Sequence, residues 1–472
     1  MKKLAKRLLL AMLAASMCMT GVACGTGTGE DDTAGETAAP ETAAVETAAA
    51  ETEEAEIAKT EDDGMKRFEI TYFYGPHNEQ LIDESFYEKI ADAGFTSIPL
   101  EYGNTELNKK ALPILKKYGL TCSALSDSRI DAVIGYDRTF SPDTPQEEVD
   151  RVISEVVADY AEYTDVIEGW LLQDEPCEAR FEILGKVVSA FRRFSPGKLT
   201  MINLLPCWAG EVNFGTATYR EYLDEFVSQV NPHYLSYDNY HFYEGGGYRA
   251  EDFFTNLELV RDKAKECGLD PMVIILLTKH HRYADLTFDQ IEWEVNTAMT
   301  YGMKRISYFT FILEQYLLDD GWDNSCMNYM GEIYPHYYDV QEINRWLLPL
   351  GNELFDKESV GVYHLRKFDW DVLEAECEEY TPTGVLGEVK GDRFVIGLFD
   401  DGSFMITNKL WDELDGEYNT FEFVDIKDGL EYFDTTDGQW KDAVAEGFVT
   451  RNENGNLTRE FHLSEGVLFR VK

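Results

Sequence analysis

Apolar and polar positions along this chain follow two periods that alternate regularly. Short apolar runs, typical of buried strands, are separated by longer stretches with apolar residues every three or four positions, as in amphipathic helices. The short runs predict strands over 67–75, 96–103, 120–127, 166–176, 198–206, 232–243, 271–281 and 305–314. The longer stretches predict helices over 83–94, 108–119, 144–163 and 287–302.

Eight successive strand-then-helix units predict a (β/α)8 barrel, an α/β fold, over residues 66–352. Several of the predicted helices end in Gly, the residue expected just past a helix C-terminus. A doubly wound open sheet is the alternative fold. It favours a Gly-rich phosphate turn after the first strand, and the segment "YFYGPHNE" does not have one.

After residue 352 the pattern changes to short alternating runs such as "GVYHLRKF", "GSFMITNKLW" and "GVLFRVK". Turns rich in Gly, Asp and Asn separate these runs, and no long amphipathic helix is present among them. This pattern predicts a C-terminal antiparallel β-sandwich over residues 353–472.

The N-terminal residues 1–24 have the pattern of an export signal, with four basic residues before a short apolar run. The run ends in "GVACG", which resembles a bacterial lipobox with Cys24 as the lipidated residue, although Gly21 stands where Leu is usual. Residues 25–65 follow as an acidic segment with three copies of ETAA, too poor in apolar residues to fold. We therefore expect an exported lipoprotein anchored to the outer face of a bacterial membrane; ordinary signal cleavage is the alternative.

Charge and cysteine usage narrow the function classes. The formal net charge is −46, and from residue 64 onward 75 acidic residues face 37 basic ones. Such a surface disfavours nucleic acid and anionic lipid as partners, which leaves the lipid anchor as the expected contact with the membrane. The cysteines show no CxxC spacing, and the adjacent His280 and His281 diverge on an extended chain, so we expect no metal and no cofactor.

Active sites of (β/α)8 barrels form where the strands end. Carboxylates, amides and aromatic rings gather at the predicted strand ends and in the loops that follow: Tyr72, Glu101, Asp174, Glu175, Asn203, Trp208, Asp238, Tyr240, Lys279, Tyr308, Glu314 and Trp322. No nucleophile elbow and no phosphate-binding loop accompany them. Carboxylates for proton transfer, together with flat aromatic faces, fit carbohydrate chemistry.

The segment "WLLQDEP" resembles the fourth-strand motif of the (β/α)8 glycoside hydrolase superfamily, in which Asn-Glu-Pro or Asp-Glu-Pro places the acid/base glutamate. "LSYDNYHF" and "ISYFTF" are similar to strands six and eight of its β-galactosidase-like barrels, those akin to family 42. The resemblance covers residues 66–350. It implies that Glu175 is the acid/base residue and that Asp174 contacts substrate.

The chain departs from that superfamily at the seventh strand. The superfamily's nucleophile is a glutamate there, and "VIILLTKHHRY" contains no carboxylate before Asp285. We expect another strand to supply the second carboxylate. Asp238 ranks first because it lies among polar and aromatic residues, Glu314 is the next candidate, and Glu101 follows.

Each candidate also has a purely structural interpretation. Asp174 and Pro176 fit the start of a helix, with Asp174 as N-cap. Asp238 could bond neighbouring loop amides, and Lys279 could be a solvated loop lysine. The tyrosines Tyr72, Tyr240 and Tyr308 suit barrel filling as well as sugar binding, whereas Trp208 and Trp322, on long loops, suit sugar binding better.

The sequence therefore predicts a cell-surface glycoside hydrolase in which Glu175 donates a proton and Asp238 or Glu314 is the second carboxylate. Predicted substrate contacts are Asp174, Tyr72, Glu101, Asn203, Trp208, Tyr240, Lys279, Tyr308 and Trp322. The alternative is a carbohydrate-binding lipoprotein with a degenerate barrel, and a purely structural surface domain is a third interpretation.

Overall fold

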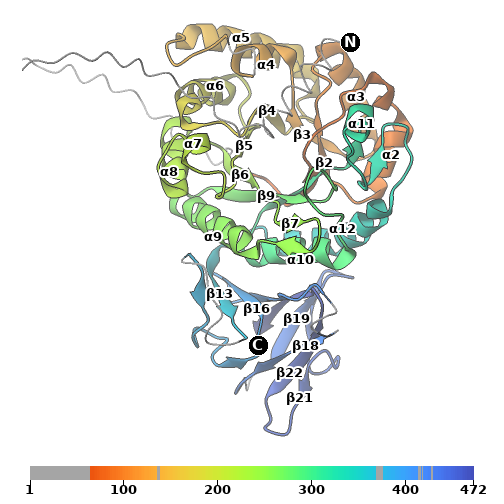
Figure 1. Ribbon diagram of the computed structural model, residues 1–472, viewed down its shortest axis with the longest axis vertical. Helices are drawn as coiled ribbons and strands as arrows, with labels where there is room; N and C mark the ends of the chain where they lie inside the picture. The colour runs from red at the N-terminus through yellow and green to blue at the C-terminus, as the bar shows by residue number, and fades with distance from the viewer. Residues whose placement is uncertain (1–63, 136–138, 368–375, 413–415, 417, 427–428) are drawn as a thin grey trace, which may run out of the picture. The chain divides into compact units, whose positions relative to one another are not determined.

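The computed structural model describes residues 64–135, 139–367, 376–412, 416, 418–426 and 429–472. In this part of the chain eight parallel strands form a near-closed barrel ringed by helices (Figure 1). The strands are β1 (Glu69–Tyr72), β2 (Ser97–Leu100), β3 (Thr121–Leu125), β4 (Gly169–Asp174), β5 (Leu199–Leu204), β6 (Tyr234–Asp238), β9 (Asp270–Leu276) and β10 (Arg305–Phe309). The predicted barrel is confirmed. The predicted signal, Cys24 and nearly all of the tether lie outside the described residues.

The barrel sheet runs in the order β1-β10-β9-β6-β5-β4-β3-β2, so its two ends are the first two strands of the chain. Just before β2, the Thr96 N–H donates to the Ile70 carbonyl at 3.0 Å. The Ile70 N–H in turn donates to Thr96 Oγ1 at 3.0 Å. These two bonds join β1 to the residue just before β2, so the barrel is nearly closed.

Helices cover the outside of the barrel. They are α2 (Glu84–Asp92), α3 (Thr105–Lys117), α4 (Ser128–Ile134), α5 (Gln146–Asp159), α6 (Phe181–Phe194), α7 (Glu211–Phe214), α8 (Tyr219–Val230), α9 (Ala250–Cys267), α10 (Phe288–Thr300), α11 (Gln315–Asp319) and α12 (Pro335–Leu354). Short 3-10 turns are η1 (Glu79–Leu81), η2 (Ala161–Tyr163) and η3 (Glu178–Arg180). Gly94 and Gly119, with φ of 83° and 72°, follow α2 and α3 as the sequence predicts.

A buried ion pair lies where strands begin, at the end of the barrel opposite the mouth. Glu69 and Arg305 are each 1% exposed and form a salt bridge. The Arg305 guanidinium also lies 5.3 Å from the ring centroid of Tyr234. Removing one partner would strand a buried charge, at a cost of about 3–5 kcal/mol. The Glu69–Arg305 pair therefore stabilises the fold, and it lies away from the mouth, where the chemistry of such barrels takes place.

The C-terminal part is an antiparallel sandwich. One sheet has the order β14-β13-β16-β17-β23-β19-β20 and the other β15-β18-β22-β21. The strands are β13 (Ser359–Leu365), β14 (Glu378–Glu379), β15 (Val389–Lys390), β16 (Phe394–Phe399), β17 (Phe404–Asn408), β18 (Tyr418–Phe423), β19 (Leu430–Asp434), β20 (Gln439–Asp442), β21 (Thr450–Arg451), β22 (Leu457–His462) and β23 (Gly466–Val471). Phenylalanines from both sheets fill its core, which confirms the predicted sandwich.

The sandwich packs on helix α10 of the barrel. Thr300 Oγ1 lies 2.7 Å from Thr407 Oγ1, and Asn296 Nδ2 donates to the Ser464 carbonyl at 3.0 Å. At Gly397 the two parts approach so closely that a Cβ would lie 2.0 Å from the Thr300 carbonyl oxygen. Residues 63–472 accordingly form one compact unit.

Two small strand pairs extend the loops at the barrel mouth. One is the antiparallel hairpin of β7 (Phe242–Tyr243) and β8 (Gly247–Tyr248), and the other is the parallel pair of β11 (Ile312–Leu313) and β12 (Met327–Asn328). Across the described ranges, no helix is both long and apolar enough to cross a membrane. Within the described ranges no disulfide joins the cysteines, which are Cys122, Cys177, Cys207, Cys267, Cys326 and Cys377.

Candidate active site

Two aspartates at the barrel mouth share one amide group. Asp174 ends β4, Asp238 ends β6, and Asn203 lies on β5 between them. The Asn203 Nδ2 donates to Asp174 Oδ1 at 3.0 Å and to Asp238 Oδ1 at 2.8 Å. Because both oxygens bond one nitrogen, they lie within about 6 Å of each other. Ser236 Oγ donates to Asn203 Oδ1 at 3.3 Å, which fixes the orientation of the amide.

The paired carboxyls hold protons more tightly than ordinary aspartates. Burial raises the pKa of both, the charge of Asp174 raises the pKa of Asp238 further, and the Asn203 hydrogen bonds oppose both shifts. Asp238 is 7% exposed, whereas Asp174 opens to solvent at the rim. Two interacting carboxyls with raised pKa values lose their protons in two separate steps. Between those steps the pair is one neutral acid and one carboxylate.

Glu175 follows Asp174 in an unusual backbone conformation. Its φ of 44° lies in the left-handed region, which non-glycine residues adopt mainly at functional sites. The Glu175 N–H donates to the Asn203 carbonyl at 2.8 Å, and the Tyr222 hydroxyl donates to the Pro176 carbonyl at 2.7 Å. These bonds hold the turn from both sides.

The alternative that Asp174 caps a helix is wrong. The first helical turn after β4 is η3, which begins at Glu178, and its N-cap residue Cys177 makes no side-chain capping bond. Asp174 instead binds the Asn203 amide. The two adjacent acids therefore lie at the mouth for a reason other than helix capping.

The Tyr240 side chain lies next to all three acids. Burial raises its phenol pKa well above the ordinary value, and the charges of Asp238, Asp174 and Glu175 raise it further. Coulomb energy falls with distance, so these contributions identify the acids as close neighbours of the ring. Tyr240 stays neutral and is 9% exposed at the edge of the carboxylate group.

A second group of carboxyls lies at the ends of β2 and β10. Glu101 Oε1 accepts the Gly75 N–H at 2.6 Å, and its Oε2 lies 3.6 Å from His77 Nε2. Glu314 Oε1 accepts the backbone N–H groups of His77 and Asn78 at 2.6 and 3.0 Å. Glu314 thus anchors the loop after β1, and these bonds account for its position at the mouth.

Burial governs the protonation of this second group. It raises the pKa of Glu101 to about 8, raises that of Glu314, and lowers the pKa of His77 to about 4. Near neutral pH Glu101 is therefore protonated and His77 is neutral. The 3.6 Å contact between them is therefore one between neutral groups rather than an ion pair.

Tyr74 connects the two groups of acids. Its hydroxyl lies 2.6 Å from that of Tyr316, and burial is the main cause of its raised pKa. The charges of Glu101, Glu314 and Asp174 raise that pKa further. The acids at the ends of β2, β4 and β10 therefore share one mouth.

Aromatic rings form a wall beside the paired aspartates. Tyr240 stacks on Phe309 with ring centroids 5.3 Å apart, and Trp322 stacks on His280 at 4.5 Å. His280 Nδ1 donates to the Thr278 carbonyl at 2.7 Å, and burial lowers the His280 pKa to about 4. A neutral imidazole thus occupies the end of the seventh barrel strand, β9, and the structure shows no carboxylate on the described residues 277–284 there.

The remaining predicted contacts divide into two kinds. Trp208 lies on the rim, where the guanidinium of Arg282 is 5.9 Å from its ring centroid. Lys279 pairs with Glu244 at 3.3 Å, so its charge is directed away from the aspartates. Tyr72 and Tyr308 are 1% and 0% exposed, and the Tyr308 hydroxyl donates to Asn344 Oδ1 of α12 at 2.9 Å. Their rings therefore pack between the barrel and its helices and cannot bind substrate directly.

Two residues of the site were not singled out from the sequence. Arg282 lies over the ring of Tyr243, 5.1 Å from its centroid, as well as over Trp208. His77 bridges the loop after β1 to Glu101 and Glu314. Arg282 could have been noticed in the sequence because it follows two histidines in "KHHRY". His77 could have been noticed because it lies at the end of the first predicted strand.

No group of three or more His, Cys, Asp or Glu side chains has the arrangement of a metal site among the residues that the structure describes. The carboxyls at the mouth instead accept hydrogen bonds. Asp174 and Asp238 accept from the Asn203 amide, and Glu101 and Glu314 accept from backbone N–H groups. Proton transfer by side chains is the chemistry that such an arrangement supports.

Comparisons with known proteins bear on the fold. No family model matches the sequence, and no curated protein matches it. Among solved structures, a catalytic mutant of Gan42B, a GH42 β-galactosidase from G. stearothermophilus, superposes with a TM-score of 0.54 at 9% identity, over 87% of this chain and 99% of that one.

Two further structures are a glucosidase from Croceicoccus marinus (TM-score 0.41, 14% identity, 81% of this chain and 90% of that one) and a β-galactosidase from Bacillus circulans sp. alkalophilus (0.44, 11%, 62% and 58%). At these identities the likeness concerns the backbone alone. The chain shares the backbone fold of the compared β-galactosidase structure, and here that fold is a (β/α)8 barrel followed by a β-sandwich.

Proposed function

We propose that the protein is a glycoside hydrolase that works through the carboxyls at the ends of β4 and β6. The Asn203 amide that bridges Asp174 and Asp238 is the observation that carries this proposal. Hydrolysis of a glycosidic bond needs two carboxyl groups, about 5–5.5 Å apart in retaining enzymes and about 6.5–9.5 Å apart in inverting ones. The separation that distinguishes the two outcomes here is that between Glu175 and the ionised member of the Asp174–Asp238 pair.

The roles follow from the environment of each acid. Glu175 protonates the departing oxygen, as its match to the fourth-strand motif implies. The ionised member of the Asp174–Asp238 pair attacks the sugar carbon, and the Asn203 hydrogen bonds hold that carboxylate in place. The pair supplies the second carboxylate that the seventh strand lacks.

The aromatic wall supports a carbohydrate ligand. The indole N–H groups of Trp208 and Trp322 have no hydrogen-bond acceptor within the described ranges. Both N–H groups are buried, so a sugar would contact the rings instead, and Trp208 is half-buried on the rim. Trp322 stacks on His280 and Tyr240 meets His280 edge to face, which gives an apolar wall for the C–H faces of a sugar.

The test is a screen of 4-nitrophenyl glycosides, beginning with the β-galactoside because the compared GH42 enzyme is a β-galactosidase. Glu175→Gln should lower turnover about 10²–10⁴-fold, with the smallest loss on 2,4-dinitrophenyl glycosides, whose leaving groups need little protonation. Equal turnover by the variant and the wild type on every cleaved substrate would remove Glu175 from the mechanism.

A wild-type protein that binds oligosaccharides but cleaves none would favour the second candidate, a carbohydrate-binding protein. The observation behind that candidate is the neutral His280 at the end of the seventh strand, where the superfamily has its nucleophile.

We further propose that Cys24 is lipidated and that residues 25–65 tether the barrel to the outer face of the membrane. The lipobox-like "GVACG" and the acidic ETAA repeats support this location.

A further inference from the structure

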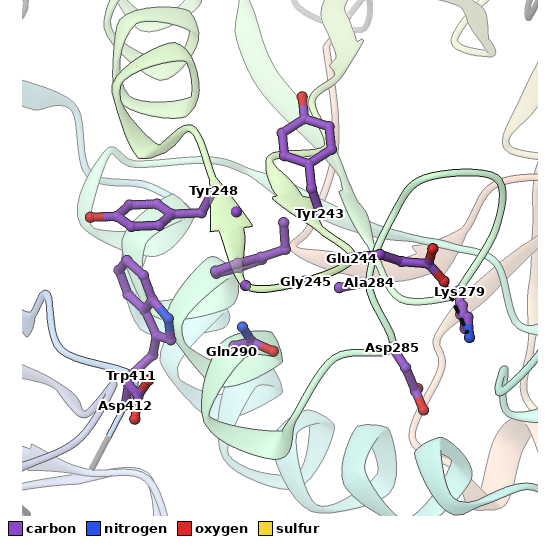
Figure 2. A pocket seen from close by; sticks show the side chains of 13 residues that line it. Tyr243, Glu244, Gly245, Tyr248, Lys279, Ala284, Asp285, Gln290, Trp411 and Asp412 are labelled. Carbon is purple, nitrogen blue, oxygen red and sulfur yellow. Dashed lines mark ion pairs between the residues drawn. The ribbon is translucent and has the colours of Figure 1, made fainter. Parts of the chain in front are cut away.

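A second cavity lies beside the mouth, between the β7–β8 hairpin and the sandwich. Its volume of about 540 Å³ falls within the roughly 300–1,000 Å³ of small-molecule sites. The barrel contributes Tyr243, Tyr248 and Lys279 to its lining, and the loop after β17 of the sandwich contributes Trp411 and Asp412 (Figure 2). Both parts of the protein therefore build the cavity.

The aromatic side of the cavity is rigidly supported. Trp411 packs against Phe242 and Trp293, with ring centroids 5.4 and 5.0 Å away. Tyr248 meets Trp411 edge to face at 4.6 Å and is 50% exposed. Figure 2 shows these two rings side by side at one wall of the cavity. Such a pair offers a fixed apolar surface that loses little conformational entropy on binding.

The opposite side is polar and predominantly acidic. Lys279 pairs with Glu244 at 3.3 Å next to Asp285 (Figure 2), and Asp285 accepts from Asn324 Nδ2 at 2.6 Å. Asp412, which lies next to Trp411, brings the lining to three carboxylates and one ammonium group. Carboxylates accept hydrogen bonds from sugar hydroxyls, and the excess negative charge disfavours anionic sugars.

The backbone keeps the space open. Gly245 and Gly246 form the turn of the hairpin with φ of 82° and 83°, a conformation that side-chain-bearing residues rarely adopt. A Cβ at either position would meet no atom within 4 Å. The glycines thus leave the floor of the cavity without side chains.

A row of aromatic rings connects the cavity to the paired aspartates. Tyr243, which lines the cavity, stacks on Tyr283 at 5.5 Å, and Tyr283 contacts Tyr240 edge to face at 5.4 Å. Tyr240 is the residue whose pKa the charge of Asp238 raises. Tyr240 and Tyr283 are buried, so these contacts form a packed wall between the aspartates and the cavity.

We propose that this cavity is a distal subsite for a neutral sugar unit of an extended glycan. The inference deepens the proposed function and rests on it for the carbohydrate class of the ligand. It assigns the sandwich a part in substrate binding, through Trp411, and it makes the substrate a neutral oligo- or polysaccharide.

Binding can be tested without catalysis. The Asp174→Asn/Asp238→Asn double variant is run through native gels that contain β-1,4-galactan, hydroxyethyl cellulose or galactomannan, and polygalacturonate serves as the anionic comparison. At least one neutral polymer should retard the protein more than polygalacturonate does. Adding Tyr248→Ala or Trp411→Ala should weaken that retardation about fivefold to tenfold, as expected for loss of a stacking ring.

Tyr338→Ala is the matched control, since Tyr338 is 62% exposed and lies on α12 away from the cavity. Trp411→Ala could weaken binding by disturbing the fold, because Trp411 packs against core rings. Tyr248 is 50% exposed, so Tyr248→Ala should fold normally and tests binding alone. Retardation unchanged by Tyr248→Ala, no retardation by any neutral polymer, or tighter binding of polygalacturonate would each overturn the subsite.

Activity measurements distinguish a failure of this inference from a failure of the proposed function. In the otherwise wild-type enzyme, Trp411→Ala and Tyr248→Ala should raise KM for the retarding polymer and leave turnover of 4-nitrophenyl glycosides unchanged. Loss of polymer retardation in those variants supports the subsite even if no glycoside is cleaved. An equal loss of activity on both substrate types would show that the rings support the mouth and not a distal subsite.

Discussion

Glu101→Gln should make the protein more stable at alkaline pH and leave it nearly unchanged at acidic pH. The Glu101 side chain is 12% exposed, and its Oε1 accepts the Gly75 N–H at 2.6 Å. Burial raises its pKa from 4.5 to about 8. The folded state therefore binds a proton between these pH values that the unfolded state has released.

The sign follows from linkage. A raised folded-state pKa contributes stability that is fully present below pH 4.5 and is lost as the pH rises through about 8. At about 1.4 kcal/mol per pKa unit, the whole shift corresponds to at most about 5 kcal/mol. Because some solvent reaches the carboxyl, we expect the measured loss to be on the order of 2–4 kcal/mol.

Urea unfolding at pH 5 and pH 9 measures the effect. Glutamine resembles the protonated acid and retains an acceptor for the Gly75 N–H, so at pH 5 the variant should lie within about 0.5 kcal/mol of wild type. At pH 9 it should be more stable by on the order of 2–4 kcal/mol. Glu88→Gln, at an exposed position on α2, is the matched control and should show no such difference. A variant with the same stability difference from wild type at both pH values would refute the burial of an ionisable Glu101.

Three further changes have expected outcomes. Cys24→Ala should move the protein from the membrane fraction to the soluble fraction on cell fractionation, because acyl chains supply the anchoring energy; a fully soluble wild type would contradict lipidation. Gly397→Ala should lower the free energy of unfolding by about 1–3 kcal/mol or more, since its Cβ would lie 2.0 Å from the Thr300 carbonyl oxygen; an unchanged urea midpoint would contradict the close packing of sandwich on α10. In Asp174→Asn the removed charge should lower the pKa of Asp238, so any residual activity should persist to lower pH than in wild type; an acid limb of kcat/KM at the same pH in both would contradict their coupling.

The fold could be predicted from sequence because its strands are buried on both faces. Segments such as "PMVIILL", within β9, are continuous apolar runs, which is how the strands of a parallel barrel differ from alternating edge strands. The short runs after residue 352 and the turns rich in Gly, Asp and Asn between them likewise indicated the sandwich.

The site was predicted less completely because contacts between side chains do not follow from strand order. Asp174, Asn203 and Asp238 were all candidates, but the bridge through Asn203 depends on the register of β4 and β5, including a bulge between Leu171 and Gln173. A one-residue shift would turn these side chains to the other face of the sheet.

A second limit on prediction was that the sequence does not show whether a side chain at a strand end points to the mouth or to the surrounding core. Tyr72 and Tyr308 lie near the ends of β1 and β10, yet their rings point outward to the helices, where the Tyr308 hydroxyl bonds Asn344 of α12. Glu314 was a candidate for catalysis, and its bonds to two backbone N–H groups emerge only once the loop after β1 folds back over β10. Such loop geometry is not encoded in the local periodicity.

Turnover of aryl glycosides by the Asp174→Asn/Asp238→Asn double variant tests the central claim most directly. The amides keep the size of the side chains and remove both ionisable groups, so thermal stability should stay near that of wild type. If the pair supplies the second carboxylate, kcat should fall at least about 10³-fold on every cleaved substrate, activated leaving groups included. Turnover of a 2,4-dinitrophenyl glycoside within about threefold of wild type would place the chemistry elsewhere and contradict the account.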